Sequence, residues 1–426
     1  MRALFTTLAK ESHLHNLVPL ASALRTAGHE VVVASQPELA ASISRSGLTA
    51  VPVGKPLHIQ RLARRTPRSA MLNGGTAMIN ETRPERLTPE YVHDLLRTSA
   101  SFYEVMADRV MTDDLVDFAR SWQPDLVVWD AMTYSGPVAA QAVGAAHARI
   151  LFGLDHWGRI REIFHRQAAD PTGPRLPDPL RHWLSGKLAP YGTGFDEETV
   201  TGQLTIDPMP PWMRYPVNLP TLPLRHIPYN GPAVIPNWLR HPPTRPRVCL
   251  TLGISLRGML DGRMSLTDLL DAVADMEVEV VATLDAEQLA EVRVPPNVRA
   301  VDFVPLNALL PSCSAVVHHG GGMTRGNAMA LGIPQLIVPN WLWDEEEFAR
   351  RLADRGAALM LTTEELTPER LRKDLERLLE DPSFGEAAAR VRRDVNSVPC
   401  PNAVVPTLED FVSRHGRGAT ENRRPR

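Results

Sequence analysis

The stretch Ala315-Val316-Val317-His318-His319-Gly320-Gly321-Gly322-Met323-Thr324 decides the fold. Val316 and Val317 suit a strand that is buried on both faces, and Thr324 is placed to open a helix. Glycines at such a junction let the backbone approach a bulky anion, and the free N–H groups of a helix start favour negative charge. We therefore predict a diphosphate-binding site formed by His319, Gly320, Gly321, Gly322 and Thr324.

Strands and helices alternate on both sides of this stretch, which predicts parallel sheets. Strands are expected at residues 3–8, 30–35, 48–53 and 125–129, and then at 248–252, 278–284, 298–304, 315–318 and 334–338. A helix from Leu17 should stop at Gly28, and Thr367 should cap another that has Pro368 at its first position. The predicted fold is α/β, with two Rossmann-like doubly wound parallel-sheet domains that face a cleft.

Prolines crowd residues 208–246, and this density is incompatible with regular helix or a central strand. We interpret the stretch as a semi-rigid connector. The predicted domains are residues 1–225 and 247–403, with a proline-rich linker at 226–246. The basic end, residues 414–426, is predicted to be a disordered tail.

Composition excludes several classes of protein. The chain has 426 residues, of which 43% are hydrophobic, and a formal net charge of −3. This is enough apolar material for two cores, and no strong field favours nucleic acid or an anionic membrane. Three dispersed cysteines exclude a disulfide framework or a CxxC metal knuckle. Without a signal-like start or a long apolar run, a cytoplasmic location is the simplest expectation.

His13 is the candidate catalytic base, because it follows the first predicted strand in a polar loop at 9–16. A neutral imidazole there could take a proton from a bound hydroxyl. His15 competes for this role, and a surface histidine is the plainer interpretation. Asp130, at the end of another strand of the same sheet, is a candidate to orient His13. An ordinary helix cap is the alternative.

Several other polar residues have weaker claims. Ser255, which follows Gly253 after a strand, could bind the same phosphates or cap a helix. Asp344 and Glu345 could hold sugar hydroxyls, but the acidic run is also typical of a first helical turn. The pair Asp113-Asp114 is interpreted as a helix start. No zinc spacing, GxGxxG after the first strand, Walker A motif or GxSxG elbow occurs.

Taken together, these segments resemble family 1 glycosyltransferases of the GT-B fold, in particular the actinobacterial enzymes that attach deoxysugars to macrolide and aromatic polyketide antibiotics. The resemblance covers nearly the whole chain. The segments on which the resemblance rests are Leu17–Leu20, Leu24–Val31, Ala34–Pro37, Pro124–Val127, Ile227–Gly231, Val301–Asn307, His318–Gly321 and Trp343-Asp344.

The resemblance implies a dTDP-deoxysugar as co-substrate and a polyketide aglycone as acceptor, with no other cofactor and no metal. Val304 would lie beside the thymine, and His319 with the glycines would bind the diphosphate. His13 would deprotonate the acceptor hydroxyl, which then displaces the nucleoside diphosphate with inversion. The family's last helix crosses back to the first domain, and residues 404–413 suit that role.

Two departures from the family pattern concern the donor. Met323 stands where a glycine is usual, and the usual Asp-Gln pair with a following asparagine is replaced by Asp344, Glu345 and Phe348. They motivate an alternative, a weakened member that acts as partner or chaperone of another transferase. A nucleotide-sugar epimerase is a further alternative. By resemblance, residues 54–107, which look irregular and carry a basic cluster, could bind a cytochrome-P450-like auxiliary protein. A homodimer is left open.

Overall fold

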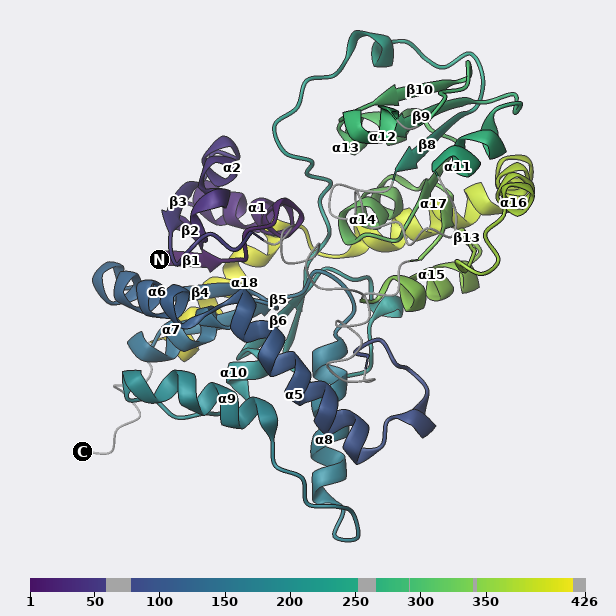
Figure 1. The fold of residues 1–426 in the computed structure, drawn as a ribbon. Coiled ribbons are helices and arrows are strands. Elements are labelled where there is room, and N and C mark those ends of the chain that lie inside the picture. Colours follow the sequence, from purple (N-terminus) through teal and green to yellow (C-terminus); the bar gives the residue numbers. More distant parts are fainter. Residues whose placement is uncertain (59–77, 252–265, 291, 340–342, 417–426) are drawn as a thin grey trace. The chain divides into compact units, whose positions relative to one another are not determined.

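The computed structural model describes residues 1–58, 78–251, 266–290, 292–339 and 343–416. The chain forms two compact units (Figure 1). The first unit comprises Met1–Met209, Arg214–Leu224 and the chain from Pro399 onward. The second comprises Pro210–Met213 and Arg225–Val398.

The first unit is built on a seven-stranded parallel sheet in the order β3-β2-β1-β4-β5-β6-β7. Its strands are β1 (Arg2–Thr6), β2 (Glu30–Ser35), β3 (Thr49–Pro52), β4 (Leu126–Asp130), β5 (Ala146–Ile150), β6 (Leu204–Asp207) and β7 (Thr221–Pro223). Leu4 lies in register with Val32 on one side and Val127 on the other. These three side chains share one face and one core cluster, as the two-residue period of a strand requires.

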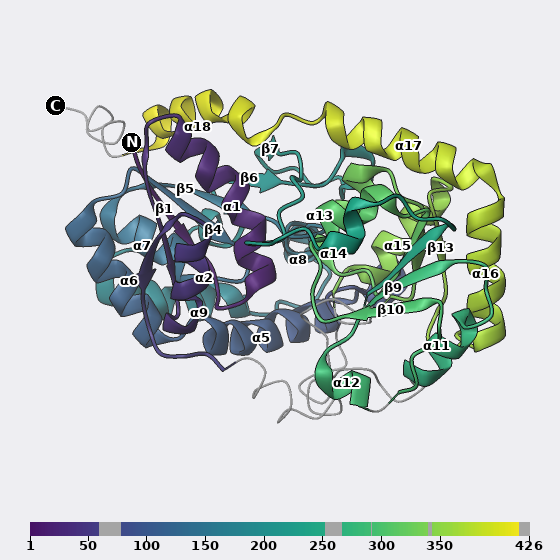
Figure 2. The ribbon, with the colours of Figure 1, turned by 90° about the horizontal axis from the view of Figure 1, so that it is seen from above.

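Helices cover both faces of this sheet, so its central strands are buried throughout. Helices α6 and α7 pack on one side, and α1 and α18 pack together on the other (Figure 2). The α-helices of the unit are α1 (Glu11–Thr26), α2 (Ala40–Arg45), α5 (Pro89–Met106), α6 (Arg109–Trp122), α7 (Ser135–Val143), α8 (His156–Ala169), α9 (Pro179–Leu188), α10 (Glu198–Thr201) and α18 (Pro401–His415). Short 3₁₀ helices span Pro37–Leu39, Pro84–Arg86 and Ala189–Tyr191.

The second unit has a six-stranded parallel sheet in the order β10-β9-β8-β11-β12-β13. Its strands are β8 (Arg247–Thr251), β9 (Glu279–Thr283), β10 (Val298–Val301), β11 (Ala315–His318), β12 (Gln335–Ile337) and β13 (Ala358–Met360). Val317 packs into a core on one face and Val316 into a different core on the other. This arrangement confirms the doubly covered strand that the sequence predicted.

The helices of the second unit follow its strands in the usual alternation. They are α11 (Leu266–Val273), α12 (Ala286–Ala290), α13 (Leu306–Leu309), α14 (Gly322–Leu331), α15 (Glu345–Asp354), α16 (Pro368–Glu380) and α17 (Pro382–Ser397), with 3₁₀ helices at Pro211–Met213, Asn237–Arg240 and Leu310–Ser312. Thr367 caps α16 through its side chain, with Pro368 at the first position, and Gly28 follows α1 with φ of +91°, both as predicted.

Three sequence interpretations were wrong in detail. The proline-rich stretch is only partly a connector, because Thr221–Pro223 forms β7 at the sheet edge, where a missing N–H is tolerated. The segment at 54–107 contains α5, which Pro89 starts, although residues 59–77 lie outside the described chain. Asp113 and Asp114 lie inside α6, whose cap is Asp108. In addition, α18 extends to His415, past the predicted start of the tail, and residues 417–426 are not described.

Candidate functional site

The candidate site of the first unit lies where the strand order of its sheet reverses. From β1 the chain proceeds outward to β2 and β3, and it then returns to β4 on the other side of β1. The carboxyl ends of two such neighbouring strands leave a crevice where ligands of doubly wound sheets bind. His13 follows β1, and Asp130 is the last residue of β4.

His13 lies in the first turn of α1 and not in a loop, which corrects the sequence prediction. The helix begins at Glu11, because the Lys10 carbonyl accepts the N–H groups of both His13 and Leu14. Glu11 complements the positive end of the helix. A helical backbone fixes the direction of the His13 side chain more firmly than a loop would.

The two predicted catalytic side chains are in contact. Nδ1 of His13 lies 2.7 Å from Oδ2 of Asp130, and both residues are buried. The other carboxylate oxygen accepts the Met132 N–H at 3.0 Å. Because an ionised carboxylate can only accept, Nδ1 carries the proton, and Nε2 of the neutral ring has its lone pair. The pair therefore has the arrangement of a general base with its orienting acid.

Neighbouring contacts hold the imidazole in place. The Phe152 ring packs against it with the ring centroids 4.7 Å apart. Asn16 donates its amide to the Leu151 carbonyl at 3.0 Å, which ties α1 to the end of β5. His15 lies 3.4 Å from Glu11 on its own helix. The contact with Asp130 thus distinguishes His13 from its competitor His15.

The candidate site of the second unit follows β11, again where the strand order of the sheet reverses. His318, the last residue of β11, accepts the Gly320 N–H at Nδ1, 2.9 Å away. Its Nε2 must then carry the proton, and it donates to Gln335 at 2.9 Å. Burial lowers the pKa of His318 to about 4, which keeps this ring neutral. His318 thus positions the glycine turn and does not itself face an anion.

The glycine turn could not be built from other residues. Gly320 has φ of +90°, and a Cβ placed there would lie 2.9 Å from Cβ of Glu345. A Cβ on Gly321 would lie 2.5 Å from Nε2 of His319, so the half-buried imidazole covers that glycine. Gly320 is thus required by its backbone conformation and by the close approach of Glu345, whereas Gly321 is explained by the close approach of the His319 ring.

Helix α14 begins at Gly322, two residues before the predicted position. Gly321 is its N-cap and offers no side chain, so the N–H groups of the first turn have no acceptor within the described residues. Met323 lies in this turn with a half-buried side chain, and Thr324 is buried behind it. Such a helix start is suited to an anion. The predicted diphosphate ligands His319 to Thr324 thus form the connection between the end of β11 and the first turn of α14.

Asp344 belongs to a buried ion pair that the sequence did not predict. Both of its oxygens accept from Arg325 of α14, at 2.7 and 2.5 Å, and both side chains are buried. The Arg325 guanidinium also stacks over Phe348, 4.2 Å from the ring centre. Phe348, the unusual residue at this position, is thus a support for Arg325. An arginine within the small residues of α14 was the available signal for this pair.

The remaining predicted donor residues are placed as follows. Glu345 is partly buried beside Gly320, and its Oε2 accepts the Trp343 N–H at 2.9 Å. Val304 buries its side chain in the core, and its backbone N–H and C=O have no partner in the described chain. Ser255 lies outside the described residues.

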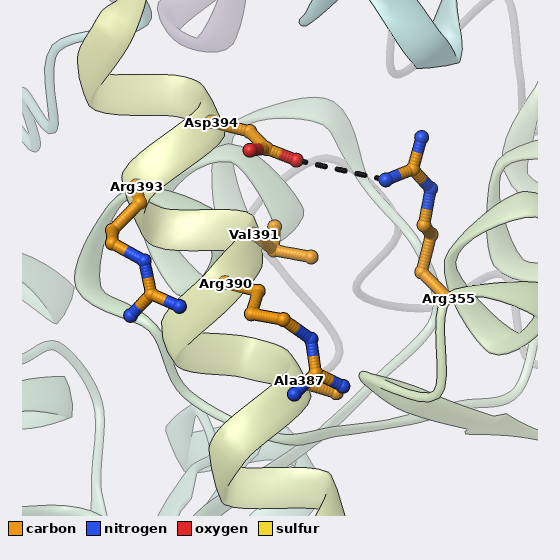
Figure 3. Close-up of a pocket in the computed structure, with 6 residues that line it drawn as sticks. All are labelled: Arg355, Ala387, Arg390, Val391, Arg393 and Asp394. Carbon is orange, nitrogen blue, oxygen red and sulfur yellow. Dashed lines mark ion pairs between the residues drawn. The ribbon is translucent and has the colours of Figure 1, made fainter.

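A cavity of about 290 Å³ in the second unit is lined by none of the predicted site residues. It lies against α17, and an ion pair of 3.7 Å between Arg355 and Asp394 crosses it (Figure 3). Its lining residues are Arg355, Ala387, Arg390, Val391, Arg393 and Asp394.

Within the described residues, no group of three or more metal-ligating side chains occurs. No described helix is both long and apolar enough to cross a membrane.

Two parallel-sheet units, one with a buried histidine–carboxylate pair and one with a glycine turn that leads into a helix, place the chain in the GT-B class of glycosyltransferase. Solved structures agree with this class. Glycosyltransferase VinC in complex with dTDP shares 53% identity over 97% of this chain and all of its own, with a TM-score of 0.89. Spinosyn forosaminyltransferase SpnP shares 45% over 97% of this chain and 99% of its own, with a TM-score of 0.81.

The family follows from the sequence comparisons. The models of the erythromycin biosynthesis protein CIII-like N-terminal and C-terminal domains match residues 22–253 and 267–411. Aclacinomycin-T 2-deoxy-L-fucose transferase of Streptomyces galilaeus is 52% identical, covering 98% of this chain and 97% of its own. The 10-deoxymethynolide desosaminyltransferase of Streptomyces venezuelae is 46% identical over 99% and 100%. This chain belongs to the erythromycin biosynthesis protein CIII-like family of family 1 glycosyltransferases.

Proposed function

We propose that this protein transfers a deoxysugar from a dTDP-linked donor to a hydroxyl group of a polyketide aglycone, with inversion at the anomeric carbon. The transferase activities named for its relatives and the dTDP bound by VinC support the substrate classes. The observation that carries the chemistry is the 2.7 Å contact between His13 and Asp130.

In this mechanism Nε2 of His13 takes the proton from the acceptor hydroxyl as its oxygen attacks the anomeric carbon. The bond to the nucleoside diphosphate breaks in the same displacement, and its electrons leave with the phosphate oxygen. Asp130 stabilises the imidazolium that forms, because the two charges lie in direct contact in a buried site. A positioned general base of this kind contributes about 10²–10⁴ in rate.

The donor would be held by the second unit. The free N–H groups at the start of α14, together with His319, would bind the diphosphate and stabilise the leaving charge. The backbone N–H and C=O of Val304, which have no partner among the described residues, suit a pyrimidine edge, because that edge offers both donor and acceptor atoms. Asp344 and Glu345 stay predicted ligands of the sugar hydroxyls, and Glu345 packs beside Gly320 of the glycine turn. Ser255 stays a predicted phosphate ligand.

We propose a metal-independent reaction, because the helix start and His319 supply the stabilisation that a divalent cation would otherwise give. Full activity of the purified chain in excess chelator is the expected result. A loss of activity that added magnesium restores would contradict this part of the proposal.

Mass spectrometry tests the proposed reaction. The chain is incubated with a panel of dTDP-deoxysugars and polyketide aglycones, with His13→Ala as the matched inactive control. The expected products gain one deoxyhexose, and NMR of the purified product should show an anomeric configuration opposite to that of the donor. Sugar transfer by the His13→Ala variant at the wild-type rate would remove His13 from the mechanism.

The auxiliary protein and the homodimer remain predictions. Turnover by the lone chain, compared with turnover after addition of a P450-like protein, tests the first. Size-exclusion chromatography with light scattering tests the second.

A further inference from the structure

The segment Arg225–Asn230, where the chain enters the second unit, contacts three separate parts of that unit. It follows Leu224, the last residue of the first unit before this crossing. The segment itself is neither helix nor strand. Its side chains reach α14, the start of α13 and the end of α17, and these contacts are considered in turn.

His226 packs against the second turn of α14. A Cβ placed on Gly326 would lie 2.8 to 2.9 Å from three atoms of the His226 ring, so the ring lies directly over the helix backbone at this glycine. Nε2 of the ring lies 3.1 Å from Oδ1 of Asn327, whose side chain is fully buried. Because an amide oxygen can only accept, Nε2 carries the proton and donates this bond. Two consecutive residues of α14 are therefore fitted to the His226 ring.

A second contact holds the same part of α14 from another direction. Arg325 precedes Gly326 and binds both oxygens of Asp344, at the start of α15. Successive helical residues point about 100° apart, so these contacts lie on different sides of the helix. The helix that begins at the glycine turn is thus fixed between α15 and His226, and it cannot shift without breaking one of the two contacts.

Asn230 contacts the start of α13. The N-cap of that helix is Pro305, which has no side-chain acceptor, and Oδ1 of Asn230 accepts the Asn307 N–H at 2.8 Å instead. This N–H is one of those that a helix start leaves without a partner in its own helix. Val304, the predicted neighbour of the thymine, directly precedes Pro305. Asn230 therefore fixes the backbone next to the predicted base site.

Arg225 ties the segment to the end of α17. Its Nη1 donates to the Asn396 carbonyl at 3.1 Å. Val398, two residues further along, is the last residue of the second unit before the chain returns to the first. The entry and the exit of the chain are thus joined to each other within the second unit.

We infer that Arg225–Asn230 is a strap that sets the spacing between the diphosphate and thymine halves of the donor site, with His226 and Asn230 as its positioning residues. This inference rests on the proposed function, which places the diphosphate at α14 and the thymine at Val304. Each positioning residue acts through the element that it holds and not by contact with the ligand. A ligand that spans both halves depends on their spacing, whereas a ligand that occupies one half does not.

The experiment measures the affinity of the full chain for dTDP by calorimetry and for thymidine by NMR titration. His226→Ala should weaken dTDP binding roughly 10-fold, the order of effect of residues that act on a site through packed neighbours. Thymidine binding should stay within about twofold of the wild type, because Asn230 still holds the base site. Asn230→Ala should weaken the binding of both ligands, and Asn230→Asp, which keeps the acceptor oxygen, should restore it. His241→Ala, at an exposed histidine further along the linker, is the matched control and should bind as the wild type does.

Gly326→Ala gives a second measurement that leaves His226 in place. In the wild-type background the added Cβ must displace the ring, so dTDP binding should weaken roughly 10-fold. In the His226→Ala background the ring is gone, and the same substitution should cost no further affinity. This non-additivity is specific to the contact between the two residues, and a general loss of stability does not produce it. Urea unfolding of each variant confirms that the folded state is being measured.

The outcomes separate the inference from the proposed function. If His226→Ala binds dTDP as the wild type does, or loses thymidine as strongly as dTDP, the strap does not set the spacing and the inference is overturned. Equal effects of Gly326→Ala in the two backgrounds overturn it as well. Should His226→Ala fail to fold, Gly326→Ala alone decides, and unaltered dTDP affinity in that variant overturns the inference. If the wild type binds neither ligand, the proposed function itself fails.

Discussion

The contact between His13 and Asp130 allows the effect of one substitution to be calculated. In Asp130→Asn the side chain keeps its shape but loses the charge that faces the forming imidazolium. With Nδ1 and Oδ2 2.7 Å apart, the two charge centres lie about 4 Å apart. At an effective dielectric constant of about 20, the lost attraction is about 4 kcal/mol. A transition state that is less stable by this amount lowers kcat about 10³-fold.

The assay is single-turnover transfer at saturating dTDP-deoxysugar, with product quantified by mass spectrometry. Calorimetry should show dTDP affinity within about twofold of the wild type, because Asp130 belongs to the first unit and the predicted phosphate ligands to the second. Asp117→Asn, on the exposed side of α6, is the matched control and should keep full activity. Wild-type kcat in Asp130→Asn, with normal folding, would refute the assignment of Asp130 as the orienting acid.

Three further substitutions test other parts of the structure. Gly320→Ala should weaken dTDP binding at least 10-fold by calorimetry, because the added Cβ meets Glu345 and φ is +90°; unaltered affinity would contradict the glycine turn as a phosphate site. Arg325→Met should lower the free energy of unfolding in urea by about 3–5 kcal/mol, since the buried Asp344 loses the cation that both of its oxygens bind; an unchanged value would show that the pair is dispensable. Burial lowers the pKa of His147 to about 4, below its value of 6.5 in the unfolded chain. The neutral ring therefore favours the folded state above pH 6.5, and about 2 kcal/mol should be lost between pH 7 and pH 5. In His147→Gln this part of the acid sensitivity should be missing, whereas an identical pH dependence would exclude His147.

The predictable part of the fold is the part with a strong local signal. The buried strand Ala315–His318 could be predicted at its observed bounds, because consecutive valines are typical of a strand that is buried on both faces and do not show the spacing of an amphipathic helix. The short strand β13 and the edge strand β7 could not, since three residues carry too little pattern and prolines argue against a strand. Their pairing depends on neighbouring strands that lie far away in sequence.

The candidate site shows the same division. The proximity of His13 and Asp130 could be predicted, because His13 follows β1, Asp130 ends β4, and adjacent parallel strands end at one edge of a sheet. The helical setting of His13 could not, because the polar run 9–16 has no apolar period. The Arg325–Asp344 pair escaped prediction as well, because nothing in the sequence marks the two residues as partners and only the packing of α14 against α15 joins them.

The chain from Pro399 onward belongs to the first unit, and this affects how the two units could be produced separately. Helix α18 contributes Val404, Val405, Leu408 and Phe411 to the core of the first unit, and Glu409 lies 2.9 Å from Nε2 of His29. A fragment that ends at residue 225 would bare the apolar side of α1 to water and is expected to aggregate. Separate production of the amino-terminal half therefore calls for residues 399–415 to be supplied, as a fused segment or as a peptide added during refolding.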